Sequence, residues 1–133
     1  MMNRFYAVTG ALAAALLIPA APAAAAEPAV CHVRYQTYGD SLNFTGDIVI
    51  TNTGKAILYG WTLKFSLSAG HTFRNGWEAK FVVIGQDVTG YSLEHNGEVA
   101  PGKSVWVGFN ASGDVKGPRP VEFRINDQLC TTN

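Results

Sequence analysis

The side chains with the clearest chemical potential in this sequence are flat aromatic rings and amides. Trp77 follows Asn75-Gly76 at the edge of a turn, and Trp106 lies in a strand-like run that ends at Asn110. The face of an aromatic ring can stack on the C–H groups of a sugar, while amides bond its hydroxyl groups. These residue types therefore favour recognition of an uncharged, hydroxyl-rich ligand.

Residues suited to catalysis or metal binding are scattered along the chain. His32, His71 and His95 stand far apart, so they do not have the spacing of metal ligands. The sequence has neither a phosphate-binding glycine motif nor a nucleophile elbow. The small β-sandwich that the strand pattern predicts, as described below, also offers little room for the carboxylate-lined cleft of a glycoside hydrolase. We therefore expect no catalytic residue, no metal and no cofactor.

Two alternating stretches must position the aromatic residues. In 44–52 the apolar side chains Phe44, Ile48 and Ile50 share one parity, and in 61–67 Trp61 begins a second run of the same kind. An alternation with period two is typical of a half-buried strand. A strand with one apolar face needs a second layer to cover it, so these runs predict a sheet packed on a sheet.

The rest of the chain repeats this pattern in short segments. Extended runs are predicted over 31–35, 71–84, 88–93, 104–110 and 121–125, with turn signals such as Asn96-Gly97 and Pro101-Gly102 between them. Outside the N-terminal stretch no ten residues have helical spacing. The pattern predicts an all-β fold, an antiparallel immunoglobulin-like sandwich of about nine strands in one domain.

Residues 1–26 have the composition of a secretory signal peptide. Arg4 is the only charge before Glu27, residues 11–18 are wholly apolar, and Ala24-Ala25-Ala26 resembles a signal-peptidase site. The apolar run is too short for a stable membrane span. We expect a mature, secreted, extracellular domain over 27–133, exported without an attached enzyme.

The charge balance of 27–133 argues against two classes of partner. The chain has ten basic and ten acidic residues, and removing Arg4 with the leader gives a net charge of −1. Such a domain has no electrostatic reason to bind nucleic acid or an anionic membrane. We expect an uncharged partner and a monomeric protein.

The two cysteines, Cys31 and Cys130, lie near the two ends of the predicted domain. In an oxidising compartment the simplest prediction is one disulfide that joins the first strand to the last.

Strand parity separates two of the three tryptophans. Trp61 shares parity with the apolar Leu63 and Phe65, which predicts a core position, whereas Trp106 is opposite in parity to Val107 and Phe109. Parity alone leaves two interpretations of Trp106, an exposed ring or a cover over a side core beneath the 112–120 loop.

Several short motifs, in their order and spacing, resemble the bacterial family 2 carbohydrate-binding modules. They are Cys31-x-Val33-x-Tyr35, Val49-x-x-Asn52-Thr53-Gly54, Gly60-Trp61-Thr62-Leu63-x-Phe65, Gly76-Trp77, Pro101-Gly102, Gly108-Phe109-Asn110 and Asn126-x-x-x-Cys130. The resemblance covers nearly all of 31–133. It implies a nine-stranded sandwich, the Cys31–Cys130 disulfide and a flat polysaccharide-binding face without an active site.

The sequence departs from that family at the expected face. Family members that bind cellulose usually carry three tryptophans there, but this sequence keeps only Trp77 and has Asp40 and His95 at the other two positions. Tyr38 and Trp106 instead stand where the family has polar residues. We therefore expect a redrawn aromatic strip of Tyr38, Trp77 and Trp106.

Polar residues complete the expected site. The same resemblance places Asn75, Asp47 and Asn110 on or beside polar positions of the face, with Asp40 and His95 among the rings. Near neutral pH His95 could also make binding pH-dependent, although a solvated loop histidine is the simpler interpretation. The expected function is non-catalytic binding of cellulose or chitin, and xylan after these. The alternative is a secreted protein-interaction module that keeps the fold but has lost sugar binding.

Overall fold

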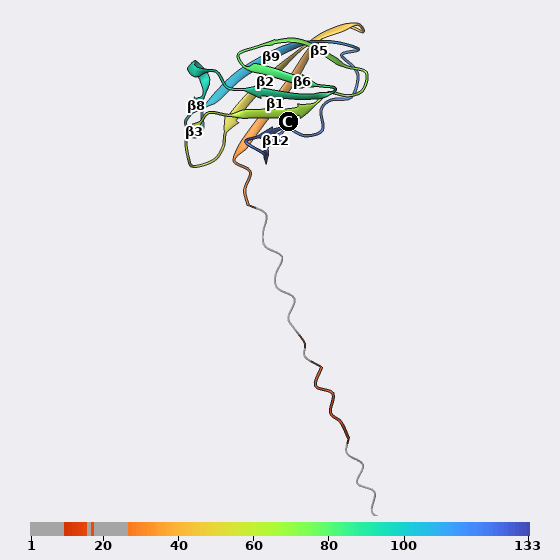
Figure 1. The fold of residues 1–133 in the computed structure, drawn as a ribbon, viewed down its shortest axis with the longest axis vertical. Coiled ribbons are helices and arrows are strands. Elements are labelled where there is room, and N and C mark those ends of the chain that lie inside the picture. The colour runs from red at the N-terminus through yellow and green to blue at the C-terminus, as the bar shows by residue number, and fades with distance from the viewer. Residues whose placement is uncertain (1–9, 16, 18–26) are drawn as a thin grey trace, which may run out of the picture.

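Two five-stranded sheets pack face to face in the computed structural model, which describes residues 10–15, 17 and 27–133 (Figure 1). Sheet one has the order β12-β1-β2-β9-β5. Its strands are β12 (Thr131–Thr132), β1 (Cys31–Gly39), β2 (Asn43–Asn52), β9 (Ser104–Ser112) and β5 (Thr72–Trp77). All neighbours in this sheet are antiparallel except β1 and β12, which pair parallel.

Sheet two has the order β11-β10-β4-β7-β6 and covers the apolar side of sheet one. Its strands are β11 (Gln128–Leu129), β10 (Arg124–Ile125), β4 (Thr62–Ser66), β7 (Asp87–Tyr91) and β6 (Lys80–Ile84). A small third sheet joins β3 (Leu58–Tyr59) to β8 (Glu98–Val99), and one 3₁₀ turn, η1 (Glu94–Asn96), precedes β8. The predicted sandwich is confirmed, and two-residue strands raise the number of its strands above the expected nine.

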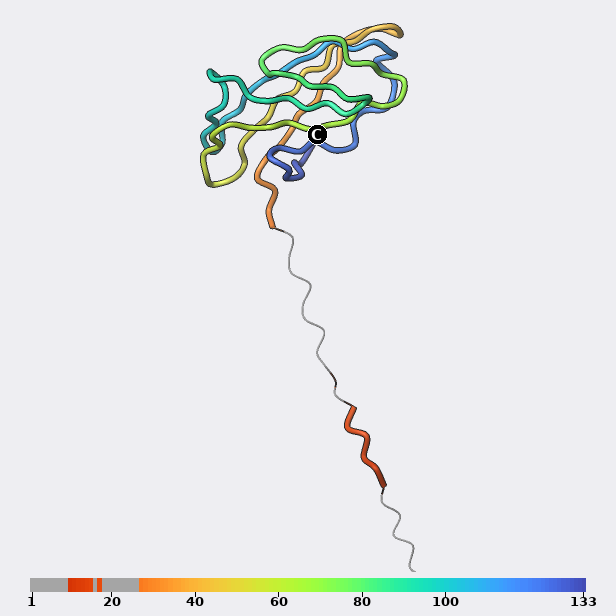
Figure 2. The backbone as a smooth tube through the Cα atoms, in the orientation of Figure 1, coloured from red at the N-terminus to blue at the C-terminus, as the bar shows by residue number. Residues whose placement is uncertain are grey.

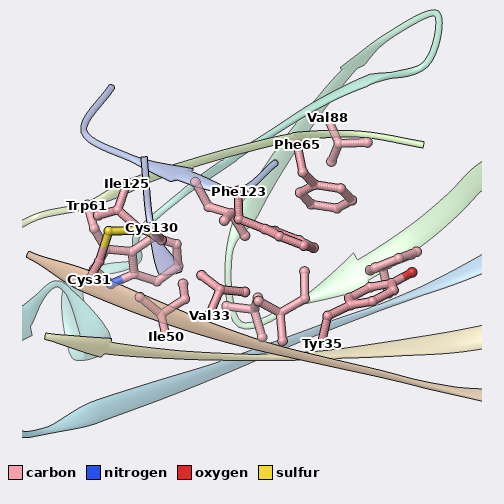
Figure 3. Packing of buried hydrophobic residues seen from close by; sticks show 14 of the residues in the cluster. Cys31, Val33, Tyr35, Ile50, Trp61, Phe65, Val88, Phe123, Ile125 and Cys130 are labelled. Atoms are coloured by element: carbon pink, nitrogen blue, oxygen red, sulfur yellow. A yellow bond between two sulfur atoms is a disulfide. The ribbon is translucent and has the colours of Figure 1, made fainter. Parts of the chain in front are cut away.

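The core forms where the inward-facing side chains of the two sheets meet. Phe109 on β9 lies against Tyr35 of β1 and Phe65 of β4, with ring centroids 6.3 and 5.5 Å apart. Trp61 is only 2% exposed, which confirms its predicted core position. Figure 3 shows Trp61 beside the disulfide at one end of this cluster and Tyr35 at the other. The outward residues of sheet one are thereby left to solvent.

The predicted disulfide between Cys31 and Cys130 is present. It closes the sandwich where β1 begins and just before β12, so that both ends of the domain lie side by side (Figure 2). The C-terminal residue adds to this closure, because the backbone N–H of Tyr35 donates to Asn133 Oδ1 at 3.0 Å.

The stretch 71–84 differs from the sequence prediction, because it forms two strands that belong to different sheets. β5 ends at Trp77 in sheet one, and β6 begins at Lys80 in sheet two. Glu78 has a φ of 65° between them, a left-handed conformation that turns the chain. Apolar alternation continues on both sides of this turn, so periodicity alone does not reveal it.

The proposed signal peptide, 1–26, lies mostly outside the described residues. Residues 10–15 and 17 have no regular secondary structure. Within the part of the chain that the structure describes, no helix has the length and apolarity needed to cross a membrane.

Candidate functional site

The outward side of sheet one carries most of the residues singled out by sequence, and we call it the outer face. Strand pairing arranges its side chains in rows that run across β1, β2, β9 and β5. The first row is Tyr38–Thr45–Asn110–Asn75, the second is Gln36–Asp47–Gly108–Trp77, and the third is Arg34–Val49–Trp106. Aromatic rings and amides therefore meet on one solvent-facing surface.

A β-bulge turns Trp77 onto this face. Phe73 packs inward against Phe109, with ring centroids 5.5 Å apart. The register of β5 against β9 shifts between Phe73 and Asn75, so that Asn75 lies opposite the outward Asn110. One extra residue in a strand reverses the sides of the residues that follow it, and Trp77 is consequently outward although it shares the parity of Phe73.

Trp77 and Trp106 form an aromatic pair with ring centroids 6.2 Å apart. Trp106 is 46% exposed, which agrees with the outward parity of its position and shows that no loop buries it. The two ring planes are inclined by 49°. The pair therefore makes an angled platform in which Trp106 is exposed and Trp77 is partly exposed.

The ring of Trp77 packs directly over Gly108. A Cβ atom at Gly108 would overlap the indole of Trp77, because the two residues are paired across β9 and β5. Any side chain at this position must push the ring away from the sheet. The sequence signal was a glycine at an outward strand position between Trp106 and Asn110.

Gly108→Ala is expected to displace the Trp77 ring while the sandwich stays folded, because Gly108 faces outward and the overlap is with a side chain. Retention on polysaccharide should fall about three- to tenfold, less than the loss caused by removing the ring itself. Depletion binding and tryptophan fluorescence would measure this. Ala111→Gly, on the inner side of the same strand, is the control for a change in strand backbone. Unchanged tryptophan fluorescence in Gly108→Ala would contradict the packing of the Trp77 ring over Gly108.

The other end of the outer face is a polar groove of about 460 Å³. Tyr38, which is 56% exposed, lines it from β1. Its remaining side-chain lining is mostly amide, hydroxyl and guanidinium, from Asn43, Thr45, Arg74, Asn75 and Asn110. Trp106 lies four residues before Asn110 on β9. At the usual rise per residue of a strand, the Cα atoms of these two residues are about 13 Å apart. The structure thus separates Tyr38 from the tryptophan pair and places it with the amides.

Asp47 lies between the groove and the tryptophan pair. Its side chain is half-buried in the second row, with Gly108 next to it in the register and Trp77 beyond. It contributes a carboxylate acceptor to the middle of the face.

Asp40 organises the loop between β1 and β2. Its Oδ1 accepts hydrogen bonds from the backbone N–H groups of Leu42 at 2.8 Å and Asn43 at 2.9 Å. The bond from Asn43, followed by that from Leu42, lowers the pKa of the Asp40 carboxyl group. The main contacts of Asp40 are therefore to its own loop, which borders the polar groove through Asn43.

The lowered pKa of Asp40 predicts a pH-dependent contribution to stability. Because the folded pKa lies below the unfolded value, the contribution is present above the unfolded pKa of about 3.9 and is lost as pH falls through the folded pKa. Asp40→Asn keeps an oxygen acceptor and removes the charge. Thermal melts should show wild type as the more stable protein near pH 6, with the difference shrinking towards pH 2. A difference that is constant over this range would contradict the assignment.

His95 stands beyond the tryptophan pair, on η1. Its Nε2 lies 2.8 Å from Glu78 Oε2, and both side chains are substantially exposed. Asn96 holds the same turn, because its side-chain N–H₂ donates to the backbone oxygen of Glu78. Since Glu78 directly follows Trp77, His95 borders the platform through Glu78 and lies away from the groove.

The sequence analysis missed several residues that shape this surface. Arg74 is an exposed bulge residue, and its Nη1 donates to Asn43 Oδ1 at 3.2 Å and Ser112 Oγ at 3.3 Å. Thr45 Oγ1 donates to Asn110 Oδ1 at 2.8 Å. Only the pairing of β2, β9 and β5 brings these side chains together. Across the described residues, no three histidine, cysteine, aspartate or glutamate side chains gather as a metal site.

Comparison with known proteins agrees with this geometry. A family model described as "Cellulose binding domain" matches residues 31–130. Exoglucanase B of Cellulomonas fimi is 40% identical over 101 residues, covering 76% of this chain and 9% of the relative. Chitinase C of Streptomyces lividans is 34% identical over 134 residues, covering 96% of this chain and 21% of the relative. The chain therefore spans about a tenth to a fifth of these curated relatives.

A solved structure shows the same fold. The chitin-binding domain of Chi18aC from Streptomyces coelicolor superposes with a TM-score of 0.62 at 29% sequence identity, covering 75% of this chain and 93% of that one.

Proposed function

Since the chain belongs to the cellulose-binding domain family, we propose that residues 27–133 bind an extended β-linked polysaccharide without catalysing a reaction. Cellulose and chitin are the first candidates and xylan is the next. The relatives support this choice, because an exoglucanase and a chitinase each contain a segment similar to this chain. The polysaccharide is the proposed partner of a monomeric domain.

One observation carries the proposal: the paired rings of the exposed Trp106 and the partly exposed Trp77 lie on the side of sheet one opposite the core. Two aromatic rings that lie together on an outward face, rather than in the core, favour a binding surface. Stacking of sugar rings on the two indoles would supply most of the affinity. Tyr38 is the third aromatic contact at the groove end of the face.

Polar residues would orient the sugar chain. Asn75 and Asn110 offer amide donors and acceptors beside Tyr38, and Asp47 offers acceptors between the two aromatic regions. Asp40 would act by shaping the loop at the groove, and His95 by contacting sugar units that extend past Trp77. These roles need no bound metal or cofactor.

The test is depletion of the mature protein from solution by microcrystalline cellulose, chitin and insoluble xylan. Saturable binding to at least one solid is expected, together with competition by its soluble oligosaccharides. If none of the three retains the protein, the polysaccharide proposal fails and the alternative, a secreted module that binds a protein partner, is favoured.

We further propose that residues 1–26 direct export and are removed before Glu27. The apolar run of 11–18 and the alanine triplet that ends at Ala26 support this. When the full chain is expressed in a secreting bacterial host, mass spectrometry of the exported protein should give an N-terminus at Glu27. Recovery only of unprocessed, cell-associated protein would contradict the proposal.

A further inference from the structure

Within residues 27–133, three of the four edge strands of the two large sheets are protected against pairing with another chain. β11 and β12 are only two residues long. β5 is interrupted by the bulge between Phe73 and Asn75 and carries the exposed Arg74. Short edges, bulges and charged side chains are the usual means by which proteins prevent edge-to-edge association.

The fourth edge strand, β6, has little of this protection. Its five residues pair with β7 in a regular register without a bulge. Val82, Val83 and Ile84 follow one another along the strand and are all exposed, Ile84 by 75%. Lys80, at the start of β6, is the only charged residue of the strand. Three consecutive exposed apolar residues on a regular edge are typical of an interaction surface.

The backbone of β6 has free hydrogen-bonding groups along its open edge. The N–H of Ser92, directly after β7, donates to the backbone oxygen of Trp61 at 2.9 Å, so the even-numbered residues of β7 bond to β4. Successive residues of a strand direct their backbone groups to opposite edges. The odd-numbered residues of β7 therefore bond to the even-numbered residues of β6. The N–H and oxygen groups of Phe81 and Val83 consequently point away from β7.

These groups fit a second copy of the same edge. In an antiparallel pair of β6 strands related by a two-fold axis, Val82 lies opposite Val82 of the other copy, and Phe81 lies opposite Val83. Each Phe81–Val83 pair then exchanges both of its backbone hydrogen bonds. The same patch is used on both copies, as a closed dimer requires.

The side chains are complementary in this register. Lys80 of one copy lies opposite Ile84 of the other, and Ile84 is paired with the exposed Asp87 within its own sheet. The ammonium group can extend over Ile84 towards this carboxylate. The two Lys80 side chains stand at opposite ends of the contact, and the two Val82 side chains meet at its centre.

The symmetry of the pair decides where its sugar-binding surfaces lie. Strands that pair antiparallel in one sheet are related by a two-fold axis perpendicular to that sheet. Rotation about this axis keeps the order of the two layers, so the outer faces of both copies lie on the same side. The two Trp77–Trp106 platforms would then face one flat surface, which lets the pair bind a solid at two places at once.

We infer that the β6 edge is a self-association surface, through which two copies pair antiparallel when the domain accumulates on a polysaccharide. The accumulation rests on the proposed function, whereas the pairing is a property of β6 itself. One pair of five-residue strands buries less than the roughly 1,200–2,000 Å² of a stable complex. The domain is therefore monomeric in dilute solution and pairs where its local concentration is high.

Cross-linking tests the register. Val82→Cys places one new thiol on the two-fold axis, where the Cα atoms of the two copies would be about 4.5 Å apart, within the range that a disulfide spans. Concentrated mature protein should form a covalent dimer in air. Val121→Cys is the control, because Val121 is 92% exposed on the loop before β10. It should give at least about tenfold less dimer.

Two further variants block the pairing. Val82→Lys places like charges opposite each other on the axis. Val83→Pro removes an N–H that points away from β7, a position at which an edge strand tolerates proline. Sedimentation equilibrium of wild type at rising concentration should show a mass above that of the monomer, whereas both variants should remain monomeric. Val121→Lys is the matched control and should behave as wild type.

Depletion by microcrystalline cellulose and chitin tests the effect on binding. At high loading the apparent affinity of wild type should exceed that of Val82→Lys about tenfold or more. The two proteins should bind a soluble oligosaccharide equally, because β6 contributes no residue to the outer face.

The outcomes separate this inference from the proposed function. Wild type that stays monomeric at every concentration would overturn self-association and leave β6 as an edge for a different protein chain. Equal yields of covalent dimer from Val82→Cys and Val121→Cys, or association that Val82→Lys leaves unchanged, would overturn the pairing through β6. Failure to bind any polysaccharide would remove the proposed function and the accumulation with it, while sedimentation and cross-linking would still decide the pairing.

Discussion

A variant that lacks both Trp77 and Trp106 is expected to lose nearly all retention on insoluble polysaccharide. On the outer face Trp106 is exposed and Trp77 is partly exposed, and the two rings are neighbours. By analogy with aromatic side chains that stack on nucleic acid bases, each ring contributes about 1–3 kcal/mol. One substitution should therefore weaken binding about tenfold, and two should weaken it about a hundredfold or more.

The control for this experiment is another exposed aromatic residue. Tyr91 is 45% exposed on the outward side of β7 in sheet two, so Tyr91→Ala removes a similar ring far from the outer face. It should leave retention unchanged. Circular dichroism and thermal melts must show that all variants are folded, which is expected because none of these rings belongs to the buried cluster. Full retention of the double variant would overturn the aromatic platform.

Replacing both cysteines by alanine is expected to reduce the free energy of unfolding by about 2–5 kcal/mol. The Cys31–Cys130 bond joins residues 99 apart in sequence, and in the chain-entropy model a loop of this length gives about 4.7 kcal/mol as an upper value. Both cysteines are buried beside Trp61, so alanine also removes some packing. Thermal melts should show a midpoint lower by at least about 10 °C.

This loss should affect stability and leave binding intact. The disulfide lies at the start of β1, near the β12 edge of sheet one. The tryptophan pair lies on β9 and β5, towards the opposite edge of this sheet. Depletion assays well below the melting midpoint should therefore give the affinity of wild type for the folded fraction. Wild type treated with a reducing agent provides an independent control. An unchanged melting midpoint would show that strand pairing alone closes the domain.

Local sequence pattern determined the layers of this protein and much of its core. Alternation with period two places Val107 and Phe109 inward and Trp106 outward, because successive side chains of a strand point to opposite sides. The same pattern identified Trp61 as a core residue. The disulfide followed from two cysteines near the ends of the predicted domain, behind a leader with the composition of a secretory signal peptide. These inferences need only neighbours along the chain.

Tertiary structure decided how the candidate site is assembled. The bulge between Phe73 and Asn75 reverses the side on which Trp77 lies, and a bulge is visible only against the partner strand. The glycine beneath Trp77, the bond from Arg74 to Asn43 and the contact between His95 and Glu78 join residues distant in sequence. The sequence could therefore identify rings and amides suited to a sugar, but the angled tryptophan platform and the polar groove exist only because β2, β9 and β5 pair in this register.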